Sequence, residues 1–447
     1  MSSETNNATG ERDPEPPRSG RFAYIAWIQA IVAVLGARAF SSAAAFLSNV
    51  LVARQLSDTV FGQFYMLFTI MSLVAGLTGP AIDTSLVRFA SRRIRPGADD
   101  SLPYFRAVLR IKLIIVLATL TVGLLAAKPL LVLLFGNAGE ASVPWYAVML
   151  AFLGGAIISI WGFAQSYFQA HQRFGWYAWF EFGSSALRLG LVVSLMMLGD
   201  VSEVHYLGVY VIAPLTMAIV SWSCLPKKVF RAPHQPGVMR EFLHFAKWVL
   251  LTTLFATLTQ RIDVILLGVF NLPDMVIGRY SAAVCLVLVG ELVWLTFFNV
   301  LLPKAGALQQ PSELKRFLVQ FRYPTLVFCA GLSLLIPLGG WLRELTFGSG
   351  YIGTEGYFSV LIVGVIIALS STPSIAVLYS LGHTRWITGC EAFRLSCTLI
   401  MGITAIPWYG AYGVACSVTF ARVAMTVLIF WAAHRYLNRA VQEASAK

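Results

Sequence analysis

Twelve long apolar stretches fill most of this 447-residue sequence and restrict what it can fold into. Each is about 20 residues long or longer, the length that an α-helix needs to cross a bilayer. Charged residues make up only 12% of the chain, against about 25% in a typical soluble domain. The stretches are 30–53, 62–87, 111–134, 146–170, 177–198, 206–225, 243–270, 280–302, 324–342, 357–381, 386–407 and 410–433. The sequence therefore predicts an all-α polytopic membrane protein with twelve transmembrane helices. A membrane β-barrel is excluded, because its strands would be short alternating segments.

Three short patterns occur twice, in the same order and 212–216 residues apart. The first is Leu56-Ser57-Asp58 with Gly62-Gln63-Phe64, against Leu272-Pro273-Asp274 with Gly278-Arg279-Tyr280. The second is His171-Gln172-Arg173-Phe174 against His383-Thr384-Arg385-Trp386, and the third is Leu102, Phe105, Leu109 and Arg110 against Leu314, Phe317, Phe321 and Arg322. Internal repeats of this kind are typical of transporter folds, whose substrate path lies between the halves. We expect two pseudo-symmetric six-helix bundles, related by rotation about an axis along the membrane normal.

The expected domain order follows from the repeat and from composition. We expect a disordered cytoplasmic tail at 1–24, an N-terminal bundle at 25–225, a cytoplasmic linker at 226–242, a C-terminal bundle at 243–433 and a cytoplasmic tail at 434–447. The first 20 residues are polar and contain four acids, so they do not have the basic start and apolar core of a signal peptide.

Lys and Arg are concentrated in alternate loops, which predicts the orientation. The basic loops carry Arg88, Arg92, Arg93, Arg95, Arg106, Arg110 and Lys112, then Lys227, Lys228, Arg231 and Arg240, then Lys304, Lys315, Arg316 and Arg322. The loops expected on the opposite side of the membrane hold only Arg54, Lys128, Arg279 and Arg343. The positive-inside rule therefore places both termini in the cytoplasm. The net charge of +12 is mostly this topology signal, and nucleic-acid binding is not expected.

Two connections look amphipathic. Segments 101–112 and 312–323 each place an apolar stripe beside basic residues. Each could lie in the membrane interface before the chain turns into the bilayer. The alternative is that each is the start of the next span.

Several kinds of site are not indicated. There is no G-x-x-x-x-G-K-[ST] loop for ATP. The six cysteines fall within expected spans and form no C-x-x-C pair, so we expect neither disulfides nor a metal or other cofactor. The six histidines lie in loops or near the ends of spans, so no clustered catalytic group is visible and we do not expect an enzyme.

Charges within the spans are the candidates for function. Five arginines are expected inside helices: Arg38, Arg188, Arg261, Arg394 and Arg422. A charge in the bilayer interior is costly and normally faces the protein interior or a water-filled cavity. A guanidinium group can donate two hydrogen bonds to a phosphate, so this set predicts a site for an anion. The alternative for each arginine is a structural role, in which it caps a kink or pairs with a nearby acid.

The intramembrane acids are fewer. Glu391 and Arg394 lie three residues apart on one helix and can pair with each other. Asp263 and Glu291 have no obvious local partner, so each could carry a proton or sodium ion. The competing prediction for both is a salt bridge to an arginine of a neighbouring helix.

Three regions resemble a known family. Ala53-Arg54-Gln55-Leu56-Ser57-Asp58, followed by Phe61-Gly62-Gln63-Phe64-Tyr65, is similar to the first external loop of the Wzx-type polysaccharide flippases, although Ser57 stands where the family often has Gly. Gly79-Pro80-Ala81-Ile82-Asp83-Thr84-Ser85-Leu86-Val87-Arg88 resembles the end of their second helix. Arg261-Ile262-Asp263, Leu267-Gly268 and Val276-Ile277-Gly278-Arg279-Tyr280-Ser281-Ala282-Ala283 resemble their seventh-to-eighth helix region. These flippases belong to the multidrug/oligosaccharidyl-lipid/polysaccharide exporter superfamily.

The resemblance implies two six-helix bundles around an alternately accessible cavity and a polyprenyl-diphosphate-linked oligosaccharide as substrate. We therefore expect a multi-pass flippase of the cytoplasmic membrane that serves surface polysaccharide synthesis. Its partners would be the lipid-linked oligosaccharide, membrane lipids and polysaccharide polymerase or assembly proteins. An ion-coupled drug or metabolite exporter of the same superfamily is the main alternative, and a membrane-embedded transferase or polymerase is the alternative of another class. A lipid II flippase is disfavoured, because that family usually has fourteen spans.

Overall fold

The computed structural model describes residues 20–91, 93–95, 98–199, 201–231, 237–308 and 310–445, so the predicted tail at 1–24 lies almost wholly outside them. Nearly all of the described chain is helical. The elements are α1 (Gly20–Gln55), α2 (Asp58–Thr78), α3 (Pro80–Ser91), β1 (Ile94–Arg95), β2 (Ala98–Asp99), α4 (Leu102–Ser142), α5 (Trp145–Ala170), α6 (Phe174–Met197), α7 (Glu203–Ser223), α8 (Lys227–Arg231), α9 (Val238–Thr259), α10 (Ile262–Val269), α11 (Asp274–Gly306), α12 (Pro311–Gln320), α13 (Arg322–Ser333), α14 (Gly339–Phe347), η1 (Ser349–Tyr351), α15 (Thr354–Ser370), α16 (Thr372–Ser380) and α17 (Thr384–Ser445).

The predicted apolar stretches lie mostly on helix, but stretch 324–342 departs from the prediction, because residues 334–338 form a turn between α13 and α14. In the described part of the chain, seven helices are long and apolar enough to cross a membrane, and two bent pairs, α9 with α10 and α15 with α16, meet the same criterion together. Their outward side chains are apolar too: on α4, Leu117 is 68% exposed and Leu125 is 73% exposed. Such surfaces suit lipid rather than water. The chain is a multi-pass membrane protein.

Gly410 explains why α17 contains two of the predicted spans. Its φ of 55° and ψ of −135° are not helical, so the 62-residue element turns there. Glycine tolerates positive φ because it lacks a Cβ atom. Pro407, three residues earlier, also weakens the helical hydrogen bonding. The predicted boundary between 386–407 and 410–433 therefore coincides with a real turn.

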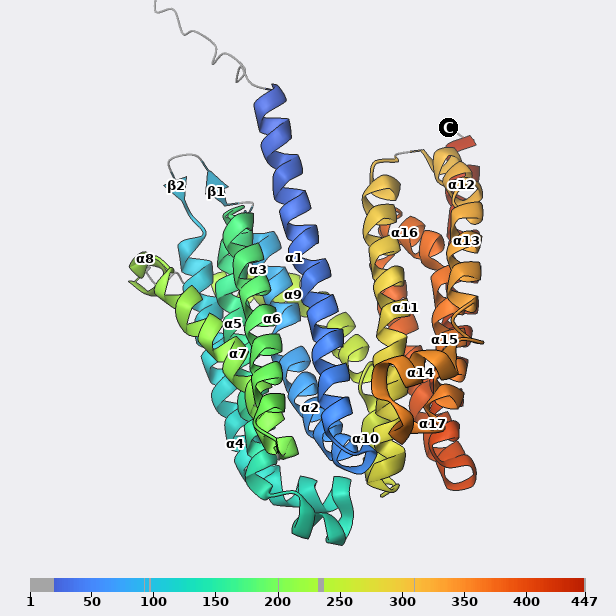
Figure 1. Cartoon of the computed structure of the whole chain (residues 1–447). Coiled ribbons are helices and arrows are strands. Elements are labelled where there is room, and N and C mark those ends of the chain that lie inside the picture. Colours follow the sequence, from blue (N-terminus) through green and yellow to red (C-terminus); the bar gives the residue numbers. More distant parts are fainter. Residues whose placement is uncertain are drawn as a thin grey trace, which may run out of the picture.

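The two halves of the chain are α1–α8 and α9–α17. Apart from α9, which packs against α3 of the first half, they meet at one end and stand apart at the other (Figure 1). We call the end with the α1–α2 turn and the start of α11 the joined end, and the opposite one, where α1 begins and α17 ends, the termini end. At the joined end, a single apolar cluster contains residues of both halves, such as Phe61 and Phe64 with Ile277 and Tyr280. Toward the termini end, one separate cluster is built mainly from α3–α7 and another from α16 and α17.

Two glycines set the contact at the joined end. A Cβ atom on Gly62 of α2 would overlap the carbonyl oxygen of Asp274, and one on Gly278 of α11 would overlap that of Asp58. The two glycines occupy equivalent positions in the repeated pattern, 216 residues apart. Their missing side chains let the backbones of α2 and α11 approach closely, as small residues do between membrane helices.

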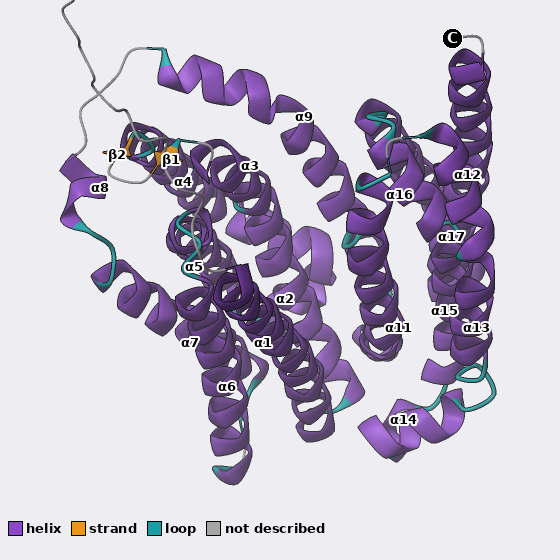
Figure 2. Cartoon of the chain, turned by 90° about the horizontal axis from the view of Figure 1, so that it is seen from above, coloured by secondary structure: helices purple, strands orange, loops and turns teal. Residues whose placement is uncertain are grey.

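Helix α9 connects the halves. Its Phe242 packs edge-on against Phe89 of α3, with ring centroids 6.3 Å apart. Further along α9, the hydroxyl oxygen of Thr252 lies 2.6 Å from the hydroxyl oxygen of Thr388 on α17. Seen from above, α9 runs from the side of the first half toward α11 and α16 (Figure 2). The seventh predicted span thus belongs to the second half by sequence but begins against the first.

The two amphipathic segments have different outcomes. Segment 312–323 forms a separate helix, α12, which buries Leu314 and Phe317 and ends before α13 begins at Arg322. Segment 101–112 is instead continuous with α4 and is the start of a span. The prediction that Lys112 is a loop cation is wrong, because its side chain is buried inside the first half.

Candidate substrate and coupling site

Arg188 of α6 lies beside an aromatic pair near the contact between the halves. Its guanidinium carbon is 5.4 Å from the centre of the Tyr210 ring of α7. Tyr210 packs against Phe68 of α2 with ring centroids 5.2 Å apart and donates a 2.5 Å hydrogen bond to Oδ1 of Asn49 on α1. The Nε atom of Arg188 is buried and has no hydrogen-bond partner. A buried donor without an acceptor is costly, so this position is suited to receive one from a ligand.

Arg261 approaches the same aromatic pair from the second half. Its guanidinium carbon is 5.5 Å from the centre of the Phe68 ring. Arg188 and Arg261 therefore flank Phe68 and Tyr210 from the two halves. Among the described residues, no carboxylate lies within ion-pair distance of either arginine.

The backbone breaks where Arg261 lies. Arg261 precedes α10, and the axes of α9 and α10 differ by 50°. Non-helical backbone at membrane depth is tolerated where it lines a cavity or is buried in protein, and transporters bind substrates and ions at such interruptions. The sequence gives little warning of this break, since the stretch 243–270 is apolar throughout apart from Lys247, Arg261 and Asp263.

Asp263 is buried immediately after the break. Its Oδ2 accepts a 3.0 Å hydrogen bond from the Tyr280 hydroxyl, and its Oδ1 accepts a 2.8 Å hydrogen bond from the backbone N–H of Val264. Its side chain is only 6% exposed, and no ion pair to it is found within the described ranges. Position in the first turn of α10 also favours a carboxylate, because the helix N-terminus carries partial positive charge.

Two other predicted arginines are neutralised by acids. Arg394 Nη2 lies 2.9 Å from Glu391 Oε2, which confirms the predicted pair on α17. Arg422 Nη2 lies 2.5 Å from Glu291 Oε1 of α11, so the neighbouring-helix salt bridge is the correct alternative for Glu291. Arg394 also interacts electrostatically with Arg422 and Glu291. The structure thus places these four residues in one charge-balanced group of the second half.

The remaining predicted site residue, Arg38, lies on α1, and its side chain is outside the described residues. Glu181, on the same helix as Arg188, is held by other groups. Gln165 Nε2 donates to its Oε2 at 2.8 Å, and the Ser41 hydroxyl donates to its Oε1 at 3.3 Å. Glu181 therefore engages neutral donors and leaves Arg188 without an acid.

A buried ion pair in the first half was not predicted. Lys112 Nζ lies 2.6 Å from Asp83 Oδ1 and donates a 2.5 Å hydrogen bond to the carbonyl of Ser159. Asp83 lies in the first turn of α3, just after the helix interruption at Gly79. In the sequence, the signal that marks Asp83 is the helix interruption at Gly79-Pro80, three residues before it. Nothing in the sequence connects Asp83 to Lys112.

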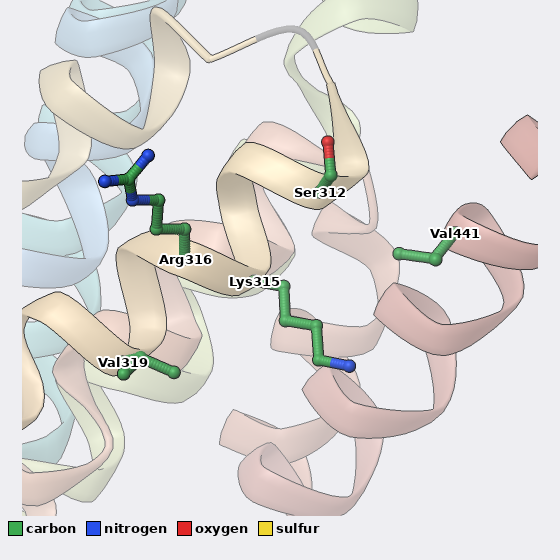
Figure 3. Close-up of a pocket in the computed structure, with 5 residues that line it drawn as sticks. All are labelled: Ser312, Lys315, Arg316, Val319 and Val441. Atoms are coloured by element: carbon green, nitrogen blue, oxygen red, sulfur yellow. The ribbon is translucent and has the colours of Figure 1, made fainter.

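One surface pocket lies far from these arginines. Ser312, Lys315, Arg316 and Val319 of α12 line it together with Val441 near the end of α17. Lys315 extends toward the helix that carries Val441, whereas Arg316 points the other way (Figure 3). None of the predicted site residues lines this pocket, and we assign it no part in transport.

Comparisons with solved structures show the same fold. Over 92% of this chain and 90% of the other, it superposes on the lipid II flippase MurJ in an inward closed conformation, with a TM-score of 0.73 and 13% identity. An inward-facing multidrug resistance MATE family transporter of the MOP superfamily gives a TM-score of 0.68 at 14% identity, covering 90% and 96% of the two chains. An outward-facing transporter of that family gives 0.59 at 13% identity, covering 92% and 95%. No curated protein matches the chain by sequence.

The sequence itself supplies the family. The pattern of the polysaccharide biosynthesis protein family matches residues 28–309, which is more than half of the chain. This agrees with the resemblance to polysaccharide flippases at 53–65 and 261–283. The chain belongs to the polysaccharide biosynthesis protein family and has the fold of the MurJ and MATE structures.

Proposed function

We propose that this protein moves a polyprenyl-diphosphate-linked oligosaccharide across the cytoplasmic membrane, in a pathway that makes surface or exopolysaccharide. The observation that carries the proposal is the pair of arginines, Arg188 and Arg261, on either side of Phe68 and Tyr210. The pyrophosphate supplies the acceptors that Arg188 lacks. The aromatic faces suit sugar C–H groups, and the separation of the halves suits the polyprenyl chain.

The distribution of Lys and Arg orients this site. With both termini in the cytoplasm, the termini end faces the cytoplasm and the joined end faces outward. The halves stand apart at the termini end (Figure 1), so this conformation would receive a lipid-linked sugar made on the cytoplasmic side. Rocking of bundles 25–225 and 243–433 about their contact would then expose the site to the other side. Polymerase or assembly proteins would take up the product there.

A cationic drug is a poorer fit to the same site. Such a substrate would need several available acids, but Glu291 and Glu391 are occupied by Arg422 and Arg394. Asp263 already accepts hydrogen bonds from Tyr280 and the Val264 backbone. The test is a comparison in proteoliposomes. Purified protein should accelerate the movement of a fluorescent lipid-linked oligosaccharide, measured by loss of fluorescence to an added quencher, and should not export a cationic dye. Dye export without movement of the lipid-linked sugar would overturn the proposal in favour of a drug exporter.

Coupling to an ion gradient is the second part of the proposal, and Asp263 is the candidate. It is buried without an ion pair, whereas Glu291, the other predicted candidate, is paired with Arg422. Binding of a proton or sodium ion to Asp263 would change the balance of conformations only if one of them binds the ion more tightly.

We therefore expect an imposed proton or sodium gradient to speed flipping by the wild type, and Asp263→Asn to abolish that dependence. Glu291→Gln is the matched control and should retain it. The measurement is the flipping rate in vesicles with and without each gradient. If the wild-type rate is the same under all conditions, transport is downhill and Asp263 is a structural cap of α10.

A further inference from the structure

The joined end carries a set of reciprocal polar contacts. One links Arg279 Nε of α11 to Asp58 Oδ2 of α2 at 2.9 Å. The other links Gln63 Nε2 of α2 to Asp274 Oδ2 of α11 at 2.7 Å. Asp58 and Asp274 are equivalent positions of the repeat, and so are Gln63 and Arg279, in both cases 216 residues apart. Each half thus offers a carboxylate to the other half's donor, as in a two-fold symmetric contact.

A second layer caps helix ends across the same contact. The Tyr351 hydroxyl of η1 donates to the carbonyls of Ala53 at 2.8 Å and Leu56 at 3.3 Å, where α1 ends. In return, Arg54 donates to the carbonyls of Leu345 and Thr346, where α14 ends, the latter at 2.6 Å. The last carbonyls of a helix have no partner within the helix, so each half satisfies acceptors of the other. Burial raises the pKa of Tyr351, which keeps its hydroxyl protonated as a donor.

These contacts account for two of the four exceptions to the charge bias. The sequence places four basic residues on the side predicted to be external: Arg54, Lys128, Arg279 and Arg343. Arg54 and Arg279 bridge the halves, and Arg343 pairs with Glu355 inside the second half at 3.2 Å. Arg54 and Arg279 therefore lie on this side of the membrane because they join the two halves at the joined end.

We propose that Asp58, Arg279, Gln63 and Asp274, with Arg54 and Tyr351, form an external latch that holds the protein open to the cytoplasm and must be released before the site opens outward. This inference rests on the proposed function, which supplies the direction in which the site opens. The contacts suit a reversible closure. The side chains of Asp58 and Arg279 are 15% and 28% exposed, so water can replace each partner when the halves separate. Gly62 and Gly278 bring the backbones close enough for all the contacts to form together.

The test measures the distance between the two halves at the joined end. Spin labels are placed at Leu198, after α6, and Trp408, beside the turn of α17, which are 75% and 84% exposed. The six native cysteines are replaced with serine or alanine, the two labelling cysteines are added, and the full-length protein is held in lipid nanodiscs. Double electron–electron resonance then gives the distance distribution without any substrate, so a failure of the flipping assay would not affect it.

We expect Arg279→Gln to raise the long-distance fraction about two- to fivefold, the scale of a partly exposed ion pair. Asp58→Asn should do the same, and the double variant should do no more than either single one, because both remove one interaction. Adding Tyr351→Phe should increase the fraction further. Arg343→Gln is the matched control: it breaks a similar pair within one half and should leave the distribution unchanged.

Three results would overturn the latch. One is an unchanged distance distribution in both Arg279→Gln and Asp58→Asn. Another is a shift by Arg343→Gln as large as theirs. The third is full additivity of Asp58→Asn and Arg279→Gln, which would show that the two residues act separately. If the wild-type protein does not move the lipid-linked sugar but the variants show the expected distance shifts, the proposed function is contradicted and the latch stands.

Discussion

Replacing Arg188 with alanine is expected to reduce the rate of lipid-linked oligosaccharide movement by about 10- to 100-fold, at unchanged protein level. A hydrogen bond to a charged group contributes about 1.5–3 kcal/mol, and about 1.4 kcal/mol corresponds to a factor of ten. Arg188 has a buried, unpartnered Nε and no acid within ion-pair distance among the described residues, so the substrate anion would be its main partner. Arg188→Lys should keep part of the activity, because it preserves the charge but not the planar donors.

The matched control for this prediction is Arg316→Ala. It removes one positive charge from the exposed surface of α12, beside the pocket of Figure 3, and should leave the rate unchanged. The measurement is initial flipping rate in proteoliposomes, with surface polysaccharide in cells as a second readout. Wild-type rates for Arg188→Ala would remove Arg188 from the site and would leave Arg261 as the only unpaired candidate among the described arginines.

Replacing Lys112 with methionine is expected to lower the free energy of unfolding by about 3–5 kcal/mol, the effect of leaving one partner of a buried ion pair without the other. Lys112 is fully buried and holds both Asp83 and the Ser159 carbonyl. The double variant Asp83→Asn with Lys112→Met should recover much of the loss, because no buried charge then remains. Thermal unfolding of the purified protein in detergent is the measurement.

Lys128→Met is the control for that stability prediction. Lys128 lies on the same helix, α4, but is exposed, so its replacement should change the unfolding temperature little. Equal destabilisation by Lys112→Met and by the double variant would show that the ion pair is not the reason for the loss.

The architecture could be predicted from sequence because the bilayer imposes it locally. A membrane helix must be predominantly apolar along its length and satisfies its own backbone hydrogen bonds, so each span is readable without knowledge of its neighbours. The twelve stretches, the turn near Gly410 and the pair of Glu391 with Arg394 all follow from such local rules. The repeated pattern at 56–64 and 272–280 likewise showed which segments are equivalent, before any contact was known.

The interior charges show where local rules end. Arg188, Arg261 and Arg422 look alike in sequence, since each is an arginine in an apolar stretch without an acid three or four residues away to pair with it. Only the packing of α11 against α17 gives Arg422 an acid, and only the packing of α2, α6, α7 and α10 brings Arg188 and Arg261 to one aromatic pair. The same holds for Lys112, whose partner Asp83 is on another helix.

The sequence by itself determined that the chain crosses the membrane many times, that short patterns recur 212–216 residues apart and which residues are too costly to place in lipid. The tertiary structure decided which of those residues neutralise one another and which are left with unsatisfied donors. The physical reason is that burial cost depends on a residue's own chemistry, whereas charge pairing depends on distances of a few ångströms between helices that are far apart in sequence. Asp58 and Arg279, separated by 221 residues and joined at 2.9 Å, exemplify that dependence.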